Sequence, residues 1–204
     1  MDCKNIYTYT ILAKFSSALS TIIPIMGENH NTVAICYYYI GLVYSSMAEY
    51  AKSLEFFNKS LNVSLAVNGE RHPYVALNYN SIAILHYRLG DQAKYIELLN
   101  KSLAIEKEIY KNNHPNLASA YNNLAFFYDN SGEYSKALEY YEKCLDMSLA
   151  IYGENHPSVA SVYNNIACVY NKMGEISNSL EIHEKALKIY LHLSQKGHSL
   201  SPRR

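Results

Sequence analysis

The chain has 204 residues, of which 49% are hydrophobic, enough for one ordinary domain with a buried core. Its 18 basic and 18 acidic residues give a formal net charge of zero, so it lacks the basic excess expected of a nucleic-acid or membrane-surface binder. The cysteines are widely spaced, which favours reduced thiols in a cytoplasmic protein over a disulfide framework. They are Cys3, Cys36, Cys144 and Cys168.

The first apolar segment covers residues 5–26. It resembles a signal peptide, but Lys14 interrupts it and no small-x-small cleavage site closes it. It also falls in register with the rest of the chain, because Phe15 lies 42 residues before Phe57. We therefore expect residues 7–25 to be the second helix of a truncated repeat. Nothing else approaches the length of a membrane span, and we expect no membrane association.

Beyond that segment a histidine recurs every 42 residues without an insertion, at His30, His72, His114, His156 and His198. Such strict phase indicates a repeat architecture. We expect a partial repeat at 1–26, complete repeats at 27–68, 69–110, 111–152 and 153–194, and a tail at 195–204. The chain is then either a segment of a longer array, which we favour, or a complete one whose ends pack on something.

Each period predicts two helices. Proline follows the histidine in three copies, at Pro73, Pro115 and Pro157, which suits the first position of a helix. A glycine ends that helix in three copies, and Ala48 replaces it in the first. The second helix carries a Glu-before-Lys pair at i,i+4 in every copy, as in Glu139 and Lys143. These pairs predict a solvated outer face.

The motif positions identify a family. Tyr121, Leu124, Ala125 and Tyr128, followed by Ala137 and Tyr141, resemble the tetratricopeptide repeat, and the other periods carry the same pattern. The 42-residue period and the Gly-Glu-Asn-His-Pro linker are more specifically similar to kinesin light chain repeats. The resemblance covers residues 27–194. It implies an all-α, right-handed α-solenoid of helix-turn-helix repeats, in which the first helices line a concave groove.

Adjacent asparagines in the groove positions are the main candidates for binding. Asparagine is a mediocre helix former, but its amide can both donate to and accept from a peptide backbone. The family resemblance implies this role for Asn122, Asn123, Asn164 and Asn165, and more weakly for Asn80. The alternative is that one member of each pair bonds between repeats.

Other groove positions suggest the chemistry of a ligand. Tyr38 and Tyr39 would either receive an apolar side chain of a peptide or, in the case of Tyr38, cover the N-terminal half-repeat. Phe126 lies one turn beyond the central asparagines. Arg88 and Lys172 are the basic residues near the groove, and they make a carboxylate-terminated ligand a less favoured option.

The histidine ladder does not predict a metal site. Equivalent linkers in neighbouring repeats lie about 10 Å apart, whereas Zn–N bonds are about 2.0–2.1 Å. No catalytic triad, phosphate loop or paired-carboxylate cleft is legible, so we expect no enzyme activity and no cofactor.

We therefore predict a scaffold that binds a protein or peptide partner in its groove, as an adaptor similar to kinesin light chains. The alternative is a structural or regulatory segment of a larger signalling or catalytic protein. The exposed faces of the terminal helices would also allow end-to-end self-association.

Overall fold

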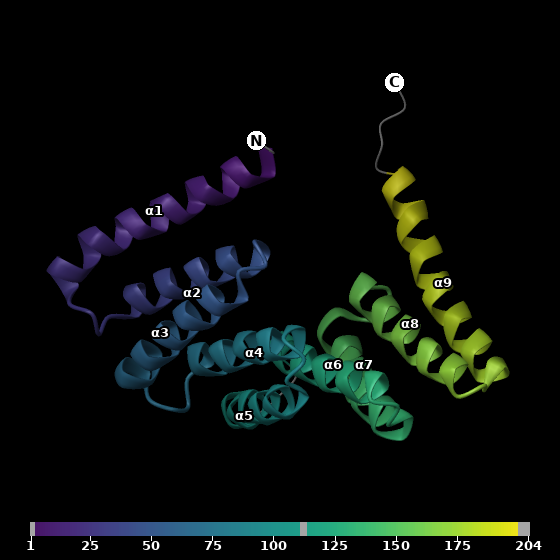
Figure 1. Ribbon diagram of the computed structural model, residues 1–204. Helices are drawn as coiled ribbons and strands as arrows, with labels where there is room; N and C mark the ends of the chain where they lie inside the picture. Colours follow the sequence, from purple (N-terminus) through teal and green to yellow (C-terminus); the bar gives the residue numbers. More distant parts are fainter. Residues whose placement is uncertain (1–2, 111–113, 200–204) are drawn as a thin grey trace. The chain divides into compact units, whose positions relative to one another are not determined.

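The computed structural model describes residues 3–110 and 114–199, and the side chains of residues 8–110 and 114–195. In these residues it contains helices and no strands (Figure 1). The helices are α1 (Cys3–Met26), α2 (Asn31–Ser46), α3 (Tyr50–Asn68), α4 (Pro73–Arg88), α5 (Gln92–Ile109), α6 (Pro115–Asn130), α7 (Tyr134–Tyr152), α8 (Pro157–Lys172) and α9 (Ile176–Ser199).

The chain forms two compact units, Met1–Ile109 and Tyr110–Arg204. In the first unit α1 packs on α2, α2 on α3, α3 on α4, and α4 on α5. In the second unit α6 packs on α7, α7 on α8, and α8 on α9. Each helix thus contacts its neighbours in the chain, which is how a solenoid stacks its repeats. The all-α repeat solenoid predicted from the sequence is confirmed.

The histidine ladder caps helices. In α2, α4, α6 and α8 the residue before the helix is a histidine with extended backbone, and its Nδ1 accepts a hydrogen bond from the N–H two residues later. The four distances are 3.1–3.2 Å. A capping side chain satisfies one of the N–H groups that the first helical turn leaves unpaired. The period of the histidines is therefore the period of helix starts.

The first helix of each complete repeat ends as predicted. Gly90, Gly132 and Gly174 have φ angles of 83°, 77° and 78°, in the left-handed region that favours glycine. Ala48 adopts the same conformation, with φ 59°, in the first repeat. An L-residue there costs about 1–2 kcal/mol, so this repeat accepts strain to keep the shared turn.

A small residue lies where the two helices of each repeat cross. It is Gly41 in α2, and a Cβ added there would lie only 2.7 Å from Cδ1 of Phe57 in α3. The equivalent residues Ala83, Ala125 and Ala167 are fully buried. The small side chain lets a large residue of the second helix fill the space between the helix backbones.

The outer face carries the expected ion pairs. In every complete repeat a lysine Nζ lies 2.5–2.8 Å from the glutamate one turn earlier. The hydrogen bond from Lys143 holds the pKa of Glu139 below its ordinary value. Both side chains stay largely exposed, at 44% and 59%. The solvated outer face predicted from the sequence is confirmed.

Helix α1 packs one face on α2. Its buried Leu19 contacts a cluster that includes Val33, Cys36 and Ile40, and Leu12, Phe15 and Ile22 pack against that cluster. By length and composition Thr8–Met26, with a mean hydropathy of 1.3, also passes for a membrane-spanning helix, and only 6% of it is buried. A signal sequence or a core helix gives the same composition. The absence of a membrane segment therefore stays a prediction.

The capping role of the histidines gives a stability test. Replacing His30 by alanine removes the acceptor for the Thr32 N–H, and we expect the free energy of unfolding to fall by about 0.5–2 kcal/mol in urea denaturation. His30→Asn restores a capping acceptor and should recover most of the loss. Equal losses in the two variants would contradict the capping role.

Candidate functional site

In the second unit, groove residues line a cavity of about 350 Å³ between α6, α7 and α8. Asn122 and Asn123 reach it from α6, and Asn165 reaches it from α8. Cys144 and Ser148 of α7 are buried and contribute to its wall. The structure thus brings together three of the four asparagines that the sequence singled out.

A hydrogen bond joins two of these asparagines. Asn165 Nδ2 donates to Asn122 Oδ1 over 3.2 Å and so links α8 to α6. This is the inter-repeat role that the sequence left open as an alternative. It uses one acceptor of Asn122 and one donor of Asn165, so the Asn122 amide N–H groups and the Asn165 carbonyl can still bind a peptide backbone.

Asn164 lies apart from the other three. It lines a separate cavity of about 360 Å³ with residues of α9, among them Leu180, Leu187 and Tyr190. Sequence reasoning treated the adjacent pair alike, but neighbouring residues of a helix point about 100° apart. Only Asn165 therefore shares the cavity between α6 and α8.

The remaining predicted residues of the second unit lie near the far end of the groove. Lys172 Nζ is 2.8 Å from both carboxylate oxygens of Asp129, a nearly buried side chain on α6. A charge held in that pair is a poor anchor for a ligand carboxylate. Phe126 is 42% exposed on α6.

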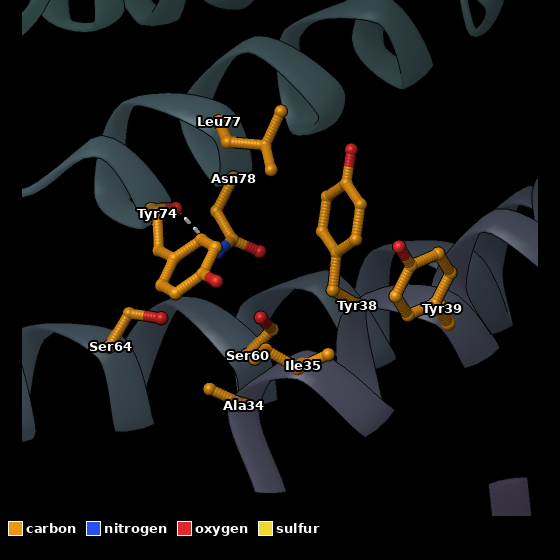
Figure 2. Close-up of a pocket in the computed structure, with 9 residues that line it drawn as sticks. All are labelled: Ala34, Ile35, Tyr38, Tyr39, Ser60, Ser64, Tyr74, Leu77 and Asn78. Carbon is orange, nitrogen blue, oxygen red and sulfur yellow. Dashed lines mark hydrogen bonds between the residues drawn. The ribbon is translucent and has the colours of Figure 1, made fainter. Parts of the chain in front are cut away.

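The first unit contains the equivalent cavity, two repeats earlier in the chain. It is smaller, about 90 Å³, and its nine lining residues come from α2, α3 and α4 (Figure 2). Tyr38 and Tyr39 stand where the second unit has Asn122 and Asn123. Tyr38 Oη lies 3.1 Å from Ser81 Oγ, at the positions of the Asn122–Asn165 bond. Burial raises the pKa of Tyr38.

The two tyrosines have different roles. The ring of Tyr39 stacks on Phe15 of α1, with 5.2 Å between centroids and 6° between planes. The ring of Tyr38 packs on Phe57, 5.3 Å away. The interpretation of Tyr38 as cover for the N-terminal helix is therefore wrong in the residue, because Tyr39 makes that contact.

Two further predicted residues lie on α4. Asn80 is half-buried, and Arg88 is exposed with its guanidinium carbon 5.9 Å from the ring centre of Tyr50. This is a cation–π distance. Arg88 and Lys172 are both engaged within their own units, which makes a carboxylate-terminated ligand less favoured still.

Other chemistry is not evident among the described residues. Those whose side chains are described contain no group of three or more His, Cys, Asp or Glu suited to a metal ion. Cys36, Cys144 and Cys168 are free thiols, and burial raises the pKa of Cys36 and Cys144.

Sequence reasoning missed three buried polar residues. Ser64 Oγ, Asn78 Oδ1 and Glu106 Oε2 are buried without a hydrogen-bond partner. Glu106 is 5% exposed on α5, where the first and third repeats have Ser64 and Ser148. Burial raises its pKa to about 7. Its signal in the sequence was a glutamate at a position where the other repeats have serine or tyrosine.

Known proteins share both the sequence pattern and this arrangement of helices. A family model described as tetratricopeptide repeat matches residues 32–108, 94–150 and 116–192. The chain belongs to the tetratricopeptide repeat family. Repeats of this family typically form scaffolds for protein–protein interaction and are generally non-catalytic. No curated protein sequence matches the chain.

Several solved structures share the fold. A kinesin light chain-like protein of Podosopora anserina with nearly identical repeats has a TM-score of 0.77 and 16% identity, over 94% of this chain and 91% of that one. BtubC (BKLC) from P. vanneervenii has a TM-score of 0.73 and 21% identity, over 84% and 68%. Apo RapI has a TM-score of 0.75 and 19% identity, over 91% of this chain and 49% of that one. At these identities the likeness shows the fold alone.

The raised pKa of Glu106 predicts how stability depends on pH. Its carboxyl titrates near 7 in the folded repeat, against an ordinary value of 4.5, so the folded protein binds more protons between these values. The free energy of unfolding should fall as pH rises from about 4.5 to about 7. Glu106→Gln should remove this fall and stabilise the protein at pH 8 by up to about 3 kcal/mol, measured by urea denaturation at several pH values.

A matched control lies on the outer face. Glu139→Gln removes an exposed carboxylate whose pKa is lowered, so it should leave the fall between pH 4.5 and 7 in place. A Glu106→Gln variant that keeps the wild-type pH dependence would contradict this assignment.

Proposed function

We propose that this tetratricopeptide repeat protein is an adaptor that binds an extended peptide of a partner protein, and that the cavity between α6 and α8 is its central contact. The observation that carries the proposal is the gathering of Asn122, Asn123 and Asn165 around that one cavity. Three amides from two adjacent repeats offer donors and acceptors for a peptide backbone without requiring a particular side chain.

The spacing of the repeats supports this mode of binding. Packed helices lie about 8–10 Å apart, and an extended peptide advances about 3.3 Å per residue. A peptide that crosses from α6 to α8 would thus present a backbone amide to each helix about every third residue. The cavity is lined by serines, alanine and asparagines rather than by charges, so we infer a neutral or weakly charged segment.

Further features are consistent with an adaptor. The free thiols suit a cytoplasmic location, which we propose for the protein. The fold also occurs within the longer RapI chain, which supports the second interpretation of this chain as a regulatory repeat segment. Both interpretations use the same groove.

The test is a peptide-display selection followed by measurement of affinity. A variant with Asn122→Ala, Asn123→Ala and Asn165→Ala should bind a selected peptide at least about tenfold more weakly than wild type, because several backbone hydrogen bonds are lost. Asn164→Ala is the matched control, since Asn164 lines a different cavity, and it should bind within about twofold of wild type. A thermal melt shows whether loss of the Asn122–Asn165 bond unfolds the repeat.

Equal enrichment of the same peptides by wild type and the triple variant would contradict the groove assignment. A stronger loss from Asn164→Ala than from the triple variant would move the binding surface to α9.

Self-association is a second candidate, favoured by the exposed face of α9. Leu180, Leu187 and Leu191 are 61%, 55% and 51% exposed, and they follow one another at helical spacing. Nothing in the described residues covers them. Exposed apolar surface of this kind marks association sites.

Sedimentation equilibrium would test this second candidate. Wild type should form dimers or larger species at micromolar concentrations, and the double variant Leu180→Glu, Leu187→Glu should stay monomeric with an unchanged helical circular-dichroism spectrum. A wild-type protein that is monomeric at all concentrations would rule it out.

A further inference from the structure

Asn78 breaks the pattern of its repeat position. The equivalent residues are Cys36, Ala120 and Val162, all apolar and buried. Asn78 is just as deeply placed, at 1% exposed. A buried amide at a position that the other repeats fill with apolar side chains has a desolvation cost that they avoid.

The amide is only half satisfied. Asn78 Nδ2 donates to the backbone carbonyl of Tyr74 over 2.8 Å, which fixes the orientation of the side chain. Its Oδ1 has no partner, and neither has Ser64 Oγ on α3. Both residues line the cavity of about 90 Å³ between α2, α3 and α4 (Figure 2). One wall of this pocket thus has an unused acceptor, and another has an unused hydroxyl.

The rest of the pocket is apolar or aromatic. Tyr38, Tyr39, Tyr74, Ile35 and Leu77 line it, and none of its lining residues is charged. Tyr39 and Tyr74 are 46% and 37% exposed, so the pocket opens to the surface between α2 and α4. The equivalent cavity of the second unit has Ser158, Ser161 and Val162 in place of Tyr74, Leu77 and Asn78 and is larger.

We infer that this pocket binds a primary carboxamide, the side chain of an asparagine or glutamine on a partner peptide. The carboxamide N–H donates to Asn78 Oδ1, and the carboxamide oxygen accepts from the Ser64 hydroxyl. The aromatic and aliphatic walls pack on the methylene stem. The pocket itself stands on its own observations, whereas its occupation by a peptide rests on the proposed function.

Other side chains fit less well. An ammonium, guanidinium or carboxylate would enter without an opposite charge. An aromatic ring is too large, since a cavity of about 150 Å³ is needed for benzene. A hydroxyl places its donor and acceptor on one atom, whereas the two unused groups lie on different helices and do not reach each other. Only a carboxamide offers a donor and an acceptor on separate atoms.

The pocket can be tested without any peptide. We expect propionamide to give saturable shifts of the Asn78 side-chain signals in nuclear magnetic resonance spectra of the full chain, whereas propionate and propylamine give none. Asn78→Val should weaken propionamide binding about tenfold or more, as expected for the loss of a hydrogen bond in a small ligand. Absence of saturable shifts in wild type, or equal shifts in Asn78→Val, would overturn the inference.

Stability separates a binding role from a structural one. Asn78→Val introduces the residue that the fourth repeat has, and it removes an unpaired buried acceptor. We therefore expect the melting temperature to stay the same or rise while binding is lost. A clear fall in melting temperature would mean that Asn78 is a structural residue, and it would overturn the inference.

The peptide selection adds an arm that distinguishes the two proposals. Selected peptides should contain glutamine or asparagine at one fixed position, and its replacement by alanine should weaken binding to wild type but not to Asn78→Val. Peptides that depend on Asn122, Asn123 and Asn165 but show no carboxamide preference would overturn this inference and leave the proposed function standing. Saturable propionamide binding without any selected peptide would do the reverse.

Discussion

The close crossing of the two helices within each repeat fixes the geometry of the solenoid. Gly41, Ala83, Ala125 and Ala167 sit at that crossing, and at Gly41 there is no room for a methyl group unless Phe57 moves. A serine of the second helix donates to the carbonyl of the small residue in two repeats, over 2.7 Å and 2.9 Å. Because the hairpin geometry is fixed there, the next capping histidine and the next groove position recur at the same interval.

A fixed hairpin leaves the groove free to vary. The cavities of the two units occupy the same register, yet one is about 90 Å³ and aromatic and the other about 350 Å³ and lined by amides. Substitutions such as Tyr38 for asparagine change the chemistry of the wall without moving the helices. A solenoid can therefore present a different contact at each repeat along one partner.

The sequence predicted the fold well because its signals are periodic and local. Proline, glycine and the apolar spacing each act within one helix or turn, so helix pairs could be located from the residues alone. The same periodicity predicted that Asn122 and Asn123 would face a groove, but it could not separate Asn164 from Asn165, because that depends on the direction of each side chain. Nor could it show that the histidines are caps, since any of several polar residues can cap a helix.

The residues that sequence reasoning missed are those that depart from the repeat. Asn78 and Glu106 are polar at positions where burial is set by neighbouring helices, and burial cannot be read from a single helix. Their departure from the register was visible, but its meaning required knowing that Asn78 Oδ1 and Glu106 Oε2 lack partners. Such residues keep a cost that an apolar side chain would avoid, and function is one reason for a protein to retain it.

A groove binder of this kind holds its partner peptide across the inner helices rather than on the outer face. Chemical-shift mapping in the full chain, on addition of a display-selected peptide, distinguishes these two surfaces in a single titration. We expect the largest changes on the side-chain amides of Asn122, Asn123 and Asn165. Changes confined to the outer face of α7, around Glu139 and Lys143, would contradict binding in the groove.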